Sequence, residues 1–549
     1  MTVRKYLQRR QQKLRRCNAY GNSDEPLLWA AAAVPILFLL AVIMKFGWGV
    51  AKAAPIGMVL AGFIAVICYR SSVTSLLYET QKGAWNAATI LLVIWPAVFS
   101  YELTCESRGF QSIRQGIQSL TQHELQQILI LGWVFPSFLQ GITGFGVAVA
   151  VGAPLLLSIG VAPFYSIVIV LLCHCWGATF GTLALAWEAL VAQSGISGIQ
   201  LSEAAVIAAV MIWCFNLVCV LYSCWLYGRW KGLKEAAPLV FILSMIMGGG
   251  QLVLAPVNGT ISCFLPSAVA LGAVFLFSRT KRYQQFWAIK DSKIMERRGT
   301  DQMDQHVMSF HQAFLPYYAL TVITVICLLV PPVNRVLELW KIGYSFPETV
   351  TGYGFITQAE VFFSPLKPLT YAGTFLLASS VISFFYYKRK GYIKSRDLAA
   401  VWHRTAHKCK SPTIAILCFI ILSKFMGSSG QIYVLSQGIV GILGRFYVIA
   451  APFFGMMGAF ITSSNMSSNI LLGNFQMTAA GILAVNPAVT VALQTVGGVL
   501  GTAFTPGCVI MGISTTGFSG SEGEILKTII PVSAGCGLLF GVAAYLFLA

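Results

Sequence analysis

The chain has 549 residues, of which 57% are hydrophobic and only 10% are charged. Apolar runs of about 20 residues, the length that a helix needs to cross the hydrocarbon core, recur from end to end, and this excludes an ordinary soluble domain. The formal net charge of +18 does not indicate nucleic-acid binding, because most Lys and Arg residues flank apolar runs, as the positive-inside rule describes.

The chain begins with a basic segment, residues 1–26, which contains the stretch MTVRKYLQRRQQKLRR. The apolar run that follows, at about 27–47, is too long for the core of a signal peptide, and no small-residue cleavage site stands out. We therefore expect residues 1–26 to be cytoplasmic and the run to be the first membrane span.

Two transmembrane halves are predicted, over residues 27–278 and 313–549, and a basic cytoplasmic loop at 279–312 joins them. An acidic loop at 334–367 is assigned to the external side. Other basic segments share the cytoplasmic assignment: 70–82, 229–234 and 388–410. The predicted fold class is an all-α polytopic membrane protein with about 12–14 transmembrane helices.

Two segments, 142–161 and 462–484, do not have the pattern of a membrane span. Each begins with a cluster of Gly, Ser, Thr or Asn, continues with weakly apolar residues and ends near a proline that opens the next helix. Non-helical backbone at membrane depth survives only where it is buried in protein or lines a wet cavity. Each segment is therefore predicted to be a re-entrant hairpin.

The two segments belong to an internal repeat. "ITGFG" at 142–146 aligns with "ITSSN" at 461–465, and "GATFGT" at 177–182 aligns with "GGVLGT" at 497–502. The predicted spans give an even number of crossings between the copies, which would make the repeat parallel. We favour an inverted repeat and a miscounted span, near 236–333 or 412–461.

Repeated halves with interrupted helices at matching positions point to a secondary transporter. Free N–H groups at a hairpin tip, helped by the positive end of a helix dipole, suit a small anion. The candidate substrate-binding residues are Gln140, Thr143, Gly144, Phe145, Gly146, Thr462, Ser463, Ser464, Asn465, Ser467, Ser468, Asn469, Gln494, Gly497 and Gly498.

These residues have a structural alternative. The GxxxG spacings at 177–181 and 497–501 are also typical of helix–helix packing. His174 is the one histidine at membrane depth, and it is predicted to be the coupling residue because imidazole titrates near physiological pH. The alternative for His174 is a neutral ring that is hydrogen-bonded between helices.

Two stretches resemble the signatures of a known family. They are "FLQGITGFGVAVAVGAPLLLSIGVAP", at 138–163, and "GAFITSSNMSSNILLGNFQMTAAGILAVNPAVTVALQTVGGVLGT", at 458–502. Both are similar to stretches of the lactate permease family, whose members are bacterial inner-membrane carriers of lactate or glycolate with protons. The chain departs from the family pattern at three charged positions, which here hold Gln140, Asn465 and Thr502. This departure puts ordinary proton–lactate coupling in doubt.

The resemblance implies a secondary carrier, in the cell membrane, for a small organic anion such as lactate or a related 2-hydroxy monocarboxylate. Coupling to H⁺ is the first expectation. A Na⁺-coupled carrier of another carboxylate and a membrane sensor without transport remain alternatives. We expect no enzymatic activity, no cofactor, no metal and no nucleic-acid partner, and the sequence does not determine the oligomeric state.

Overall fold

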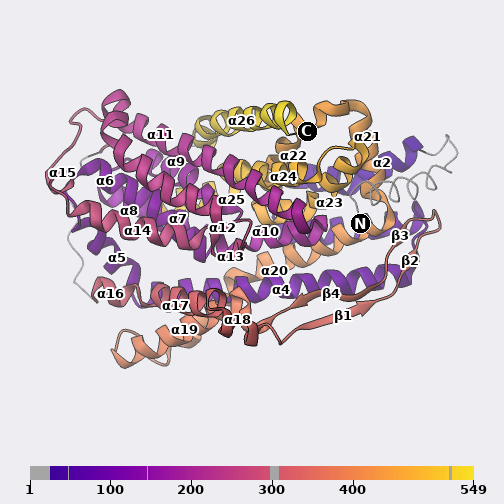
Figure 1. Ribbon diagram of the computed structural model, residues 1–549, viewed down its shortest axis with the longest axis horizontal. Helices are drawn as coiled ribbons and strands as arrows, with labels where there is room; N and C mark the ends of the chain where they lie inside the picture. Colours follow the sequence, from indigo (N-terminus) through magenta and orange to yellow (C-terminus); the bar gives the residue numbers. More distant parts are fainter. Residues whose placement is uncertain (1–24, 47, 145, 297–307, 519–521, 549) are drawn as a thin grey trace.

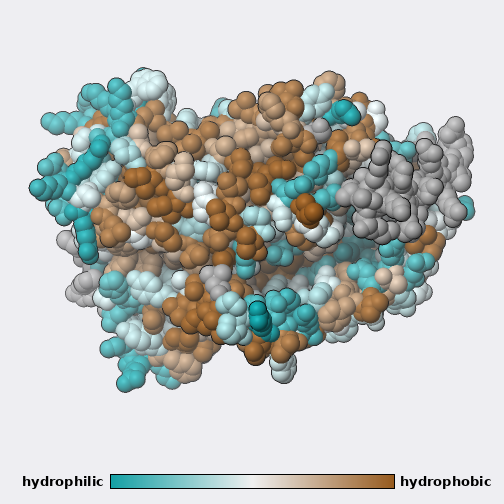
Figure 2. Space-filling model, viewed as in Figure 1, coloured by the Kyte–Doolittle hydropathy of each residue, from teal (hydrophilic) through white to brown (hydrophobic). Residues whose placement is uncertain are grey.

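The computed structural model describes residues 25–46, 48–144, 146–296, 308–518 and 522–548, and it is built almost entirely of helices (Figure 1). Within the described residues, ten helices are long and apolar enough to cross a membrane, or up to twelve if each of two bent pairs is one span. Apolar side chains cover the middle of the long axis, and polar side chains gather at the end that carries α15 (Figure 2). The prediction of an all-α polytopic membrane protein is confirmed.

The first half is a series of helices with three short distorted segments, η1, η2 and η4, that continue a helix and a fourth, η3, beside a break. Its elements are α2 (Glu25–Leu40), η1 (Ala41–Lys45), α3 (Val50–Ile67), α4 (Val73–Glu106), α5 (Gly109–Gln118), α6 (Glu124–Leu129), η2 (Ile130–Val134), α7 (Phe135–Ile142), α8 (Val147–Ser158), α9 (Pro163–His174), η3 (Cys175–Ala178), α10 (Gly181–Ser194), α11 (Gly198–Ser244), η4 (Met245–Gly249), α12 (Gly250–Leu254), α13 (Gly259–Ser262), α14 (Phe264–Ser278) and α15 (Lys281–Gln284).

The second half has the same helical character and adds four short strands. Its elements are α16 (Phe310–Ala313), α17 (Leu315–Leu329), α18 (Pro331–Leu337), β1 (Ile342–Phe346), β2 (Thr349–Val350), β3 (Ile356–Thr357), β4 (Glu360–Leu366), η5 (Pro368–Thr370), α19 (Ala372–Arg389), α20 (Asp397–Ser429), α21 (Gln431–Leu443), η6 (Gly444–Phe446), α22 (Tyr447–Thr462), α23 (Asn465–Leu483), α24 (Pro487–Thr502), α25 (Pro506–Thr516) and α26 (Glu522–Phe547).

Both predicted chain reversals are helical hairpins. In the first, α6, η2 and α7 form one arm and α8 returns along it, so that Gly132 packs against Leu156. In the second, α22 and α23 pack together, and the Ser468 hydroxyl donates to the Gly455 carbonyl at 2.9 Å. The predicted segments 142–161 and 462–484 hold only the tip and the return arm of each hairpin, because apolar length alone made the first arms look like complete spans.

The two hairpins enter from opposite ends of the molecule, as an inverted repeat requires. The first part of α11 connects their bases: Glu203, near its start, accepts a hydrogen bond from Asn486 at the base of the second hairpin. At its far end, the Tyr227 carbonyl accepts from Ser292, in the segment 285–296 that also bonds the base of the first hairpin.

The even count therefore arises because the first arm of each hairpin, at about 126–141 and 445–461, has the apolar length of a membrane span; the second of these arms lies within 412–461, where a miscount was expected. Within the described residues, seven helical passes lie between the two hairpins, an odd number: α9–α10, the two parts of α11, α14, α17, α19 and α20. The positive φ of Arg229 breaks α11 into two helices, so this element makes two passes.

The loop predicted at 334–367 carries two small antiparallel sheets, β1–β4 and β2–β3, which the all-α prediction did not include. This loop lies against the segment 70–82. The Gly352 amide donates to the Arg70 carbonyl at 2.9 Å, and Lys82 pairs with Glu360 at 3.4 Å. The prediction that 70–82 is cytoplasmic while 334–367 is external is therefore wrong for one of the two segments.

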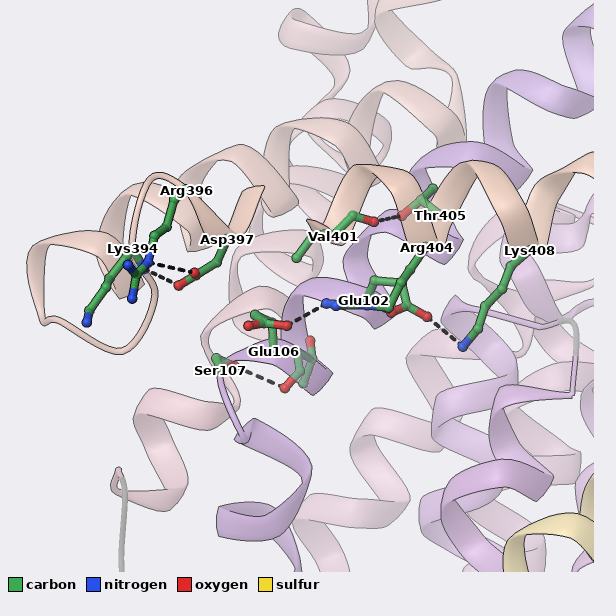
Figure 3. Close-up of polar contacts among 11 residues, drawn as sticks. Glu102, Glu106, Ser107, Lys394, Arg396, Asp397, Val401, Arg404, Thr405 and Lys408 are labelled. Atoms are coloured by element: carbon green, nitrogen blue, oxygen red, sulfur yellow. Dashed lines mark hydrogen bonds and ion pairs between the residues drawn. The ribbon is translucent and has the colours of Figure 1, made fainter. Parts of the chain in front are cut away.

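Helices α4 and α20 lie side by side and are joined by ion pairs at one end. At this end Arg404 and Lys408 of α20 reach Glu102 of α4, at 2.9 and 2.6 Å, and Arg404 also pairs with Glu106 (Figure 3). Near the start of α4, Lys82 pairs with Glu79 of the same helix, at 3.2 Å. Because the Glu102 side chain is only 3% exposed, we expect its pairing to fix the relative positions of the two helices.

Candidate functional site

A cavity of about 330 Å³ lies where both hairpin tips meet the broken span α9–α10 and the junction between α24 and α25. The cavity wall also includes residues of α3 and α20. The lining residues are Val50, Gln140, Gly146, His174, Ala178, Gly181, Thr182, Leu185, Ala186, Ser411, Pro412, Ala415, Ile416, Thr462, Ser463, Ser464, Asn465, Met466, Ser467, Thr502, Gly507, Cys508 and Met511.

The first tip depends on glycine. Gly144 and Gly146 have φ of +63° and +79°, values that other residues adopt only with strain. A Cβ added to Gly144 would lie 2.0 Å from the Thr182 hydroxyl oxygen, so the tip packs directly against the broken span. Phe145, which was predicted as a site residue, lies outside the described residues.

The second tip turns at Ser463, which has φ of +55° without being glycine. Ser464 caps the following helix, because its hydroxyl accepts a hydrogen bond from the Ser467 amide at 3.3 Å. The small polar residues of this stretch therefore lie together in the cavity wall: Thr462, Ser463, Ser464, Asn465 and Ser467.

The first broken span contains a stretch that the sequence did not predict. Thr182, Leu183 and Ala184 all have left-handed backbone, with φ between +50° and +64°, and buried non-glycine residues hold that conformation only where the surrounding structure imposes it. Thr182 lines the cavity, as does its repeat partner Thr502. The repeated GxxxGT motif was the signal that could have identified Thr182.

The cavity wall combines a cluster of small polar side chains with a larger apolar surface, and it carries almost no charge. Among the described residues that line it there is no Lys, Arg, Asp or Glu, and His174 is the one titratable imidazole. Helices α8, α23 and α25 begin at or beside lining residues, so their N-terminal N–H groups and positive dipole ends face this region. Such a site suits one delocalised negative charge better than two.

His174 lines the cavity, and its side chain is 1% exposed. Its Nδ1 atom lies 2.8 Å from the Val170 carbonyl and 3.0 Å from the Leu171 carbonyl. Since carbonyl oxygens only accept hydrogen bonds, Nδ1 carries the proton, and the neutral ring keeps Nε2 as an acceptor. A proton added to His174 would therefore go to Nε2.

Asn465 and Asn469 belong to a buried network that joins the halves. The Asn465 amide donates to the Ala178 carbonyl and the Thr179 hydroxyl, both at 3.1 Å. The Asn469 amide donates to the Ala186 carbonyl and the Thr495 hydroxyl, both at 3.0 Å. Sequence reasoning missed both threonines, because their roles depend on contacts between distant segments.

Several candidate residues do not line the cavity. Thr143 and Ser468 bond backbone carbonyls of their own hairpins. Gln494 donates to the Ser468 hydroxyl at 3.0 Å. A Cβ added to Gly497 would lie 1.9 Å from the Pro452 carbonyl oxygen, and one added to Gly498 would lie 1.8 Å from the Asn465 Oδ1 atom. These two glycines permit close packing in the second half, as the packing alternative proposed.

Comparison with known proteins identifies the chain's relatives. The family model described as L-lactate permease matches residues 29–549. The L-lactate permease of Halalkalibacterium halodurans is 23% identical over 94% of this chain and 96% of its own length. The L-lactate permease of Escherichia coli K12 is 24% identical, over 90% and 91% of the two chains, and the glycolate permease GlcA of the same organism is 24% identical over 94% and 95%.

Among solved structures, the Alcanivorax borkumensis YdaH transporter aligns over 86% of this chain and 88% of its own, with 11% identity and a TM-score of 0.41. The family match covers both hairpins, the broken span α9–α10 and helices α24 and α25, and with them every described residue that lines the cavity. The chain belongs to the L-lactate permease family.

Proposed function

We propose that the protein carries a small 2-hydroxy monocarboxylate, such as lactate or glycolate, across the membrane together with a proton. The observation that supports this most directly is the cavity between the two hairpin tips. It offers hydroxyl groups and helix N-termini to one carboxylate, and the described lining residues hold no fixed positive charge for a second carboxylate.

In this proposal the carboxylate lies near the start of α23, where Ser464 and Ser467 line the cavity. The apolar side of the substrate faces Leu185, Met466 and Met511. His174 is the coupling residue: with a second proton on Nε2 it becomes a donor and supplies the positive charge that the cavity otherwise lacks. Proton and anion then bind together, as symport requires.

The experiment is uptake by the purified protein in liposomes, with a pH gradient that is acidic outside. We expect labelled lactate to accumulate, glycolate to compete with it, and a four-carbon dicarboxylate to compete at least tenfold less well. If no monocarboxylate is taken up, and labelled lactate also fails to exchange at equal concentrations on both sides, the protein is not a carrier for this class, and the sensor alternative gains support.

A further inference from the structure

We propose that Asn465 and Asn469, with the broken span α9–α10 and helix α24, form a binding site for a monovalent cation of the size of Na⁺ beside the cavity. This inference depends on the proposed function only for what the cation is coupled to. The site itself follows from the arrangement of oxygen atoms around the two side chains.

Four oxygen atoms surround the amide nitrogens of the two asparagines. Two are backbone carbonyls, of Ala178 and Ala186, and two are hydroxyls, of Thr179 and Thr495. The two hydroxyl oxygens are themselves 2.8 Å apart. Carbonyl and hydroxyl oxygens are the ligands that hard cations prefer, and here the amide nitrogens occupy the place where a cation would lie.

The oxygens of the same two amides have no hydrogen-bond partner among the described residues, although Asn465 and Asn469 are 4% and 0% exposed. Buried acceptors are normally paired, and an unpaired one is costly. If each amide turns about its last side-chain bond, which is a soft torsion, its oxygen joins the four others. Six oxygens that face one another repel unless a cation lies between them.

The backbone provides a second, independent reason to expect a cation. Ala178 is the last residue of the half-helix formed by α9 and η3, so its carbonyl lies at the negative end of that helix dipole. In broken membrane helices, C-terminal ends and unwound carbonyls bind cations, whereas N-terminal ends bind anionic groups. Here the N-termini of α8 and α23 face the cavity.

The six oxygen ligands of the proposed site are neutral, and this favours a monovalent over a divalent cation. The described residues contain no group of three or more His, Cys, Asp or Glu side chains that could hold a metal ion, so a divalent cation would lack the carboxylates that it usually requires. Ala178, Ala186 and Asn465 also line the cavity. A cation at this site would therefore be next to a bound carboxylate and would compensate its charge.

The test measures cation binding without any substrate. The purified protein is unfolded thermally in detergent, at one pH, in NaCl or in choline chloride of equal ionic strength. A ligand that binds only the folded state raises the unfolding midpoint as its concentration rises. We expect Na⁺ to raise the midpoint of the wild type, and the Asn469→Ala variant to need at least tenfold more Na⁺ for the same rise.

Two further variants separate binding from folding. Asn469→Asp keeps an oxygen ligand and should respond to Na⁺ at least as strongly as the wild type. Asn474→Ala, on the same helix but outside the cluster, is the matched control and should respond as the wild type does. The proposal is overturned if NaCl and choline chloride give the same midpoint for the wild type, or if Asn469→Ala and Asn474→Ala respond equally to Na⁺.

Failure of the proposed function would look different. If the protein responds to Na⁺ but transports no monocarboxylate, the cation site is supported and the proposed substrate is wrong. A protein that accumulates lactate and shows no Na⁺ response keeps the carrier function and loses the cation site.

Discussion

The tip of the first hairpin offers a test of how the site is built. In Gly144→Ala the new methyl group faces two separate costs. The φ of +63° is left-handed, which costs a non-glycine residue about 1–2 kcal/mol. The new Cβ would also lie 2.0 Å from the Thr182 hydroxyl oxygen, and overpacking of this kind costs about 1–3 kcal/mol more. The total is about 2–5 kcal/mol.

A matched control isolates the first cost. Gly195 has a similar φ, +67°, but a Cβ there would meet nothing within 4 Å, so Gly195→Ala should lose only about 1–2 kcal/mol. In the double variant Gly144→Ala/Thr182→Ala the clashing hydroxyl is gone, and the second cost should largely disappear. This makes the pair strongly non-additive.

The assay is the unfolding midpoint in detergent together with the initial rate of lactate uptake in liposomes. We expect the midpoints to fall in the order wild type, Gly195→Ala, Gly144→Ala. A displaced tip that costs about 2 kcal/mol to restore would reduce uptake by about 30-fold in Gly144→Ala. The reasoning is refuted if the two single variants behave alike, or if Thr182→Ala adds to the defect of Gly144→Ala rather than relieving it.

Three other predictions follow from contacts described above. His174→Gln should flatten the pH dependence of uptake between pH 5.5 and 8 with the unfolding midpoint unchanged, and a pH profile identical to that of the wild type would remove His174 from coupling. Burial lowers the pKa of His123 below its usual 6.5, despite the hydrogen bond to Glu235. The neutral ring therefore stabilises the fold above about pH 6.5, and this contribution is lost as pH falls through the folded pKa. The His123→Asn variant, which can still cap α6, should unfold less readily in acid than the wild type, and equal acid sensitivity would contradict this. The end of the molecule that holds 229–234, 279–296 and 388–410 is the more basic one, so we expect it to face the cytoplasm. A membrane-impermeant thiol reagent should then label Lys290→Cys from the cytoplasm and Tyr344→Cys from outside. Labelling of both variants from one side would contradict this arrangement.

The labelling experiment also bears on the predicted cytoplasmic N-terminus. Residues 1–24 lie outside the described residues, but the Tyr69 hydroxyl donates to the Leu28 carbonyl at 2.7 Å, which places the start of α2 at the same end as Arg70 and the β1–β4 sheet. If Tyr344→Cys is labelled from outside, the start of α2 is at the external end, and the prediction of a cytoplasmic N-terminus fails for the described part of the chain.

The hairpins could be predicted because their signal is local. Small polar residues at membrane depth are costly unless they serve a turn or a site, and Ser463, Ser464 and Asn465 do both. The internal repeat is also visible in short stretches of sequence, and it aligns the two tips with each other. Helix packing at Gly497 was also visible in the spacing, as the alternative to a binding role.

The rest of the site depends on contacts that no local pattern contains. Ala415 and Val50 complete the cavity from helices far away in the sequence. Thr182, Leu183 and Ala184 are left-handed although nothing in these residue types favours it. The strands at 342–366 form where the loop packs along α4, with Trp85 donating to the Ser364 carbonyl at 3.0 Å. Tertiary packing, rather than propensity, determines these features.

The central claim is that the cavity between the hairpin tips is the path of a small monocarboxylate, and filling the cavity tests it most directly. Ala415 lines the cavity from α20 and is 6% exposed, whereas Lys410, on the same helix, is exposed. We predict that Ala415→Trp abolishes exchange of labelled lactate in liposomes while Lys410→Trp retains it, both proteins being folded by their unfolding midpoints. Exchange at the wild-type rate in a folded Ala415→Trp protein would contradict the account, because the anion would then cross by another route.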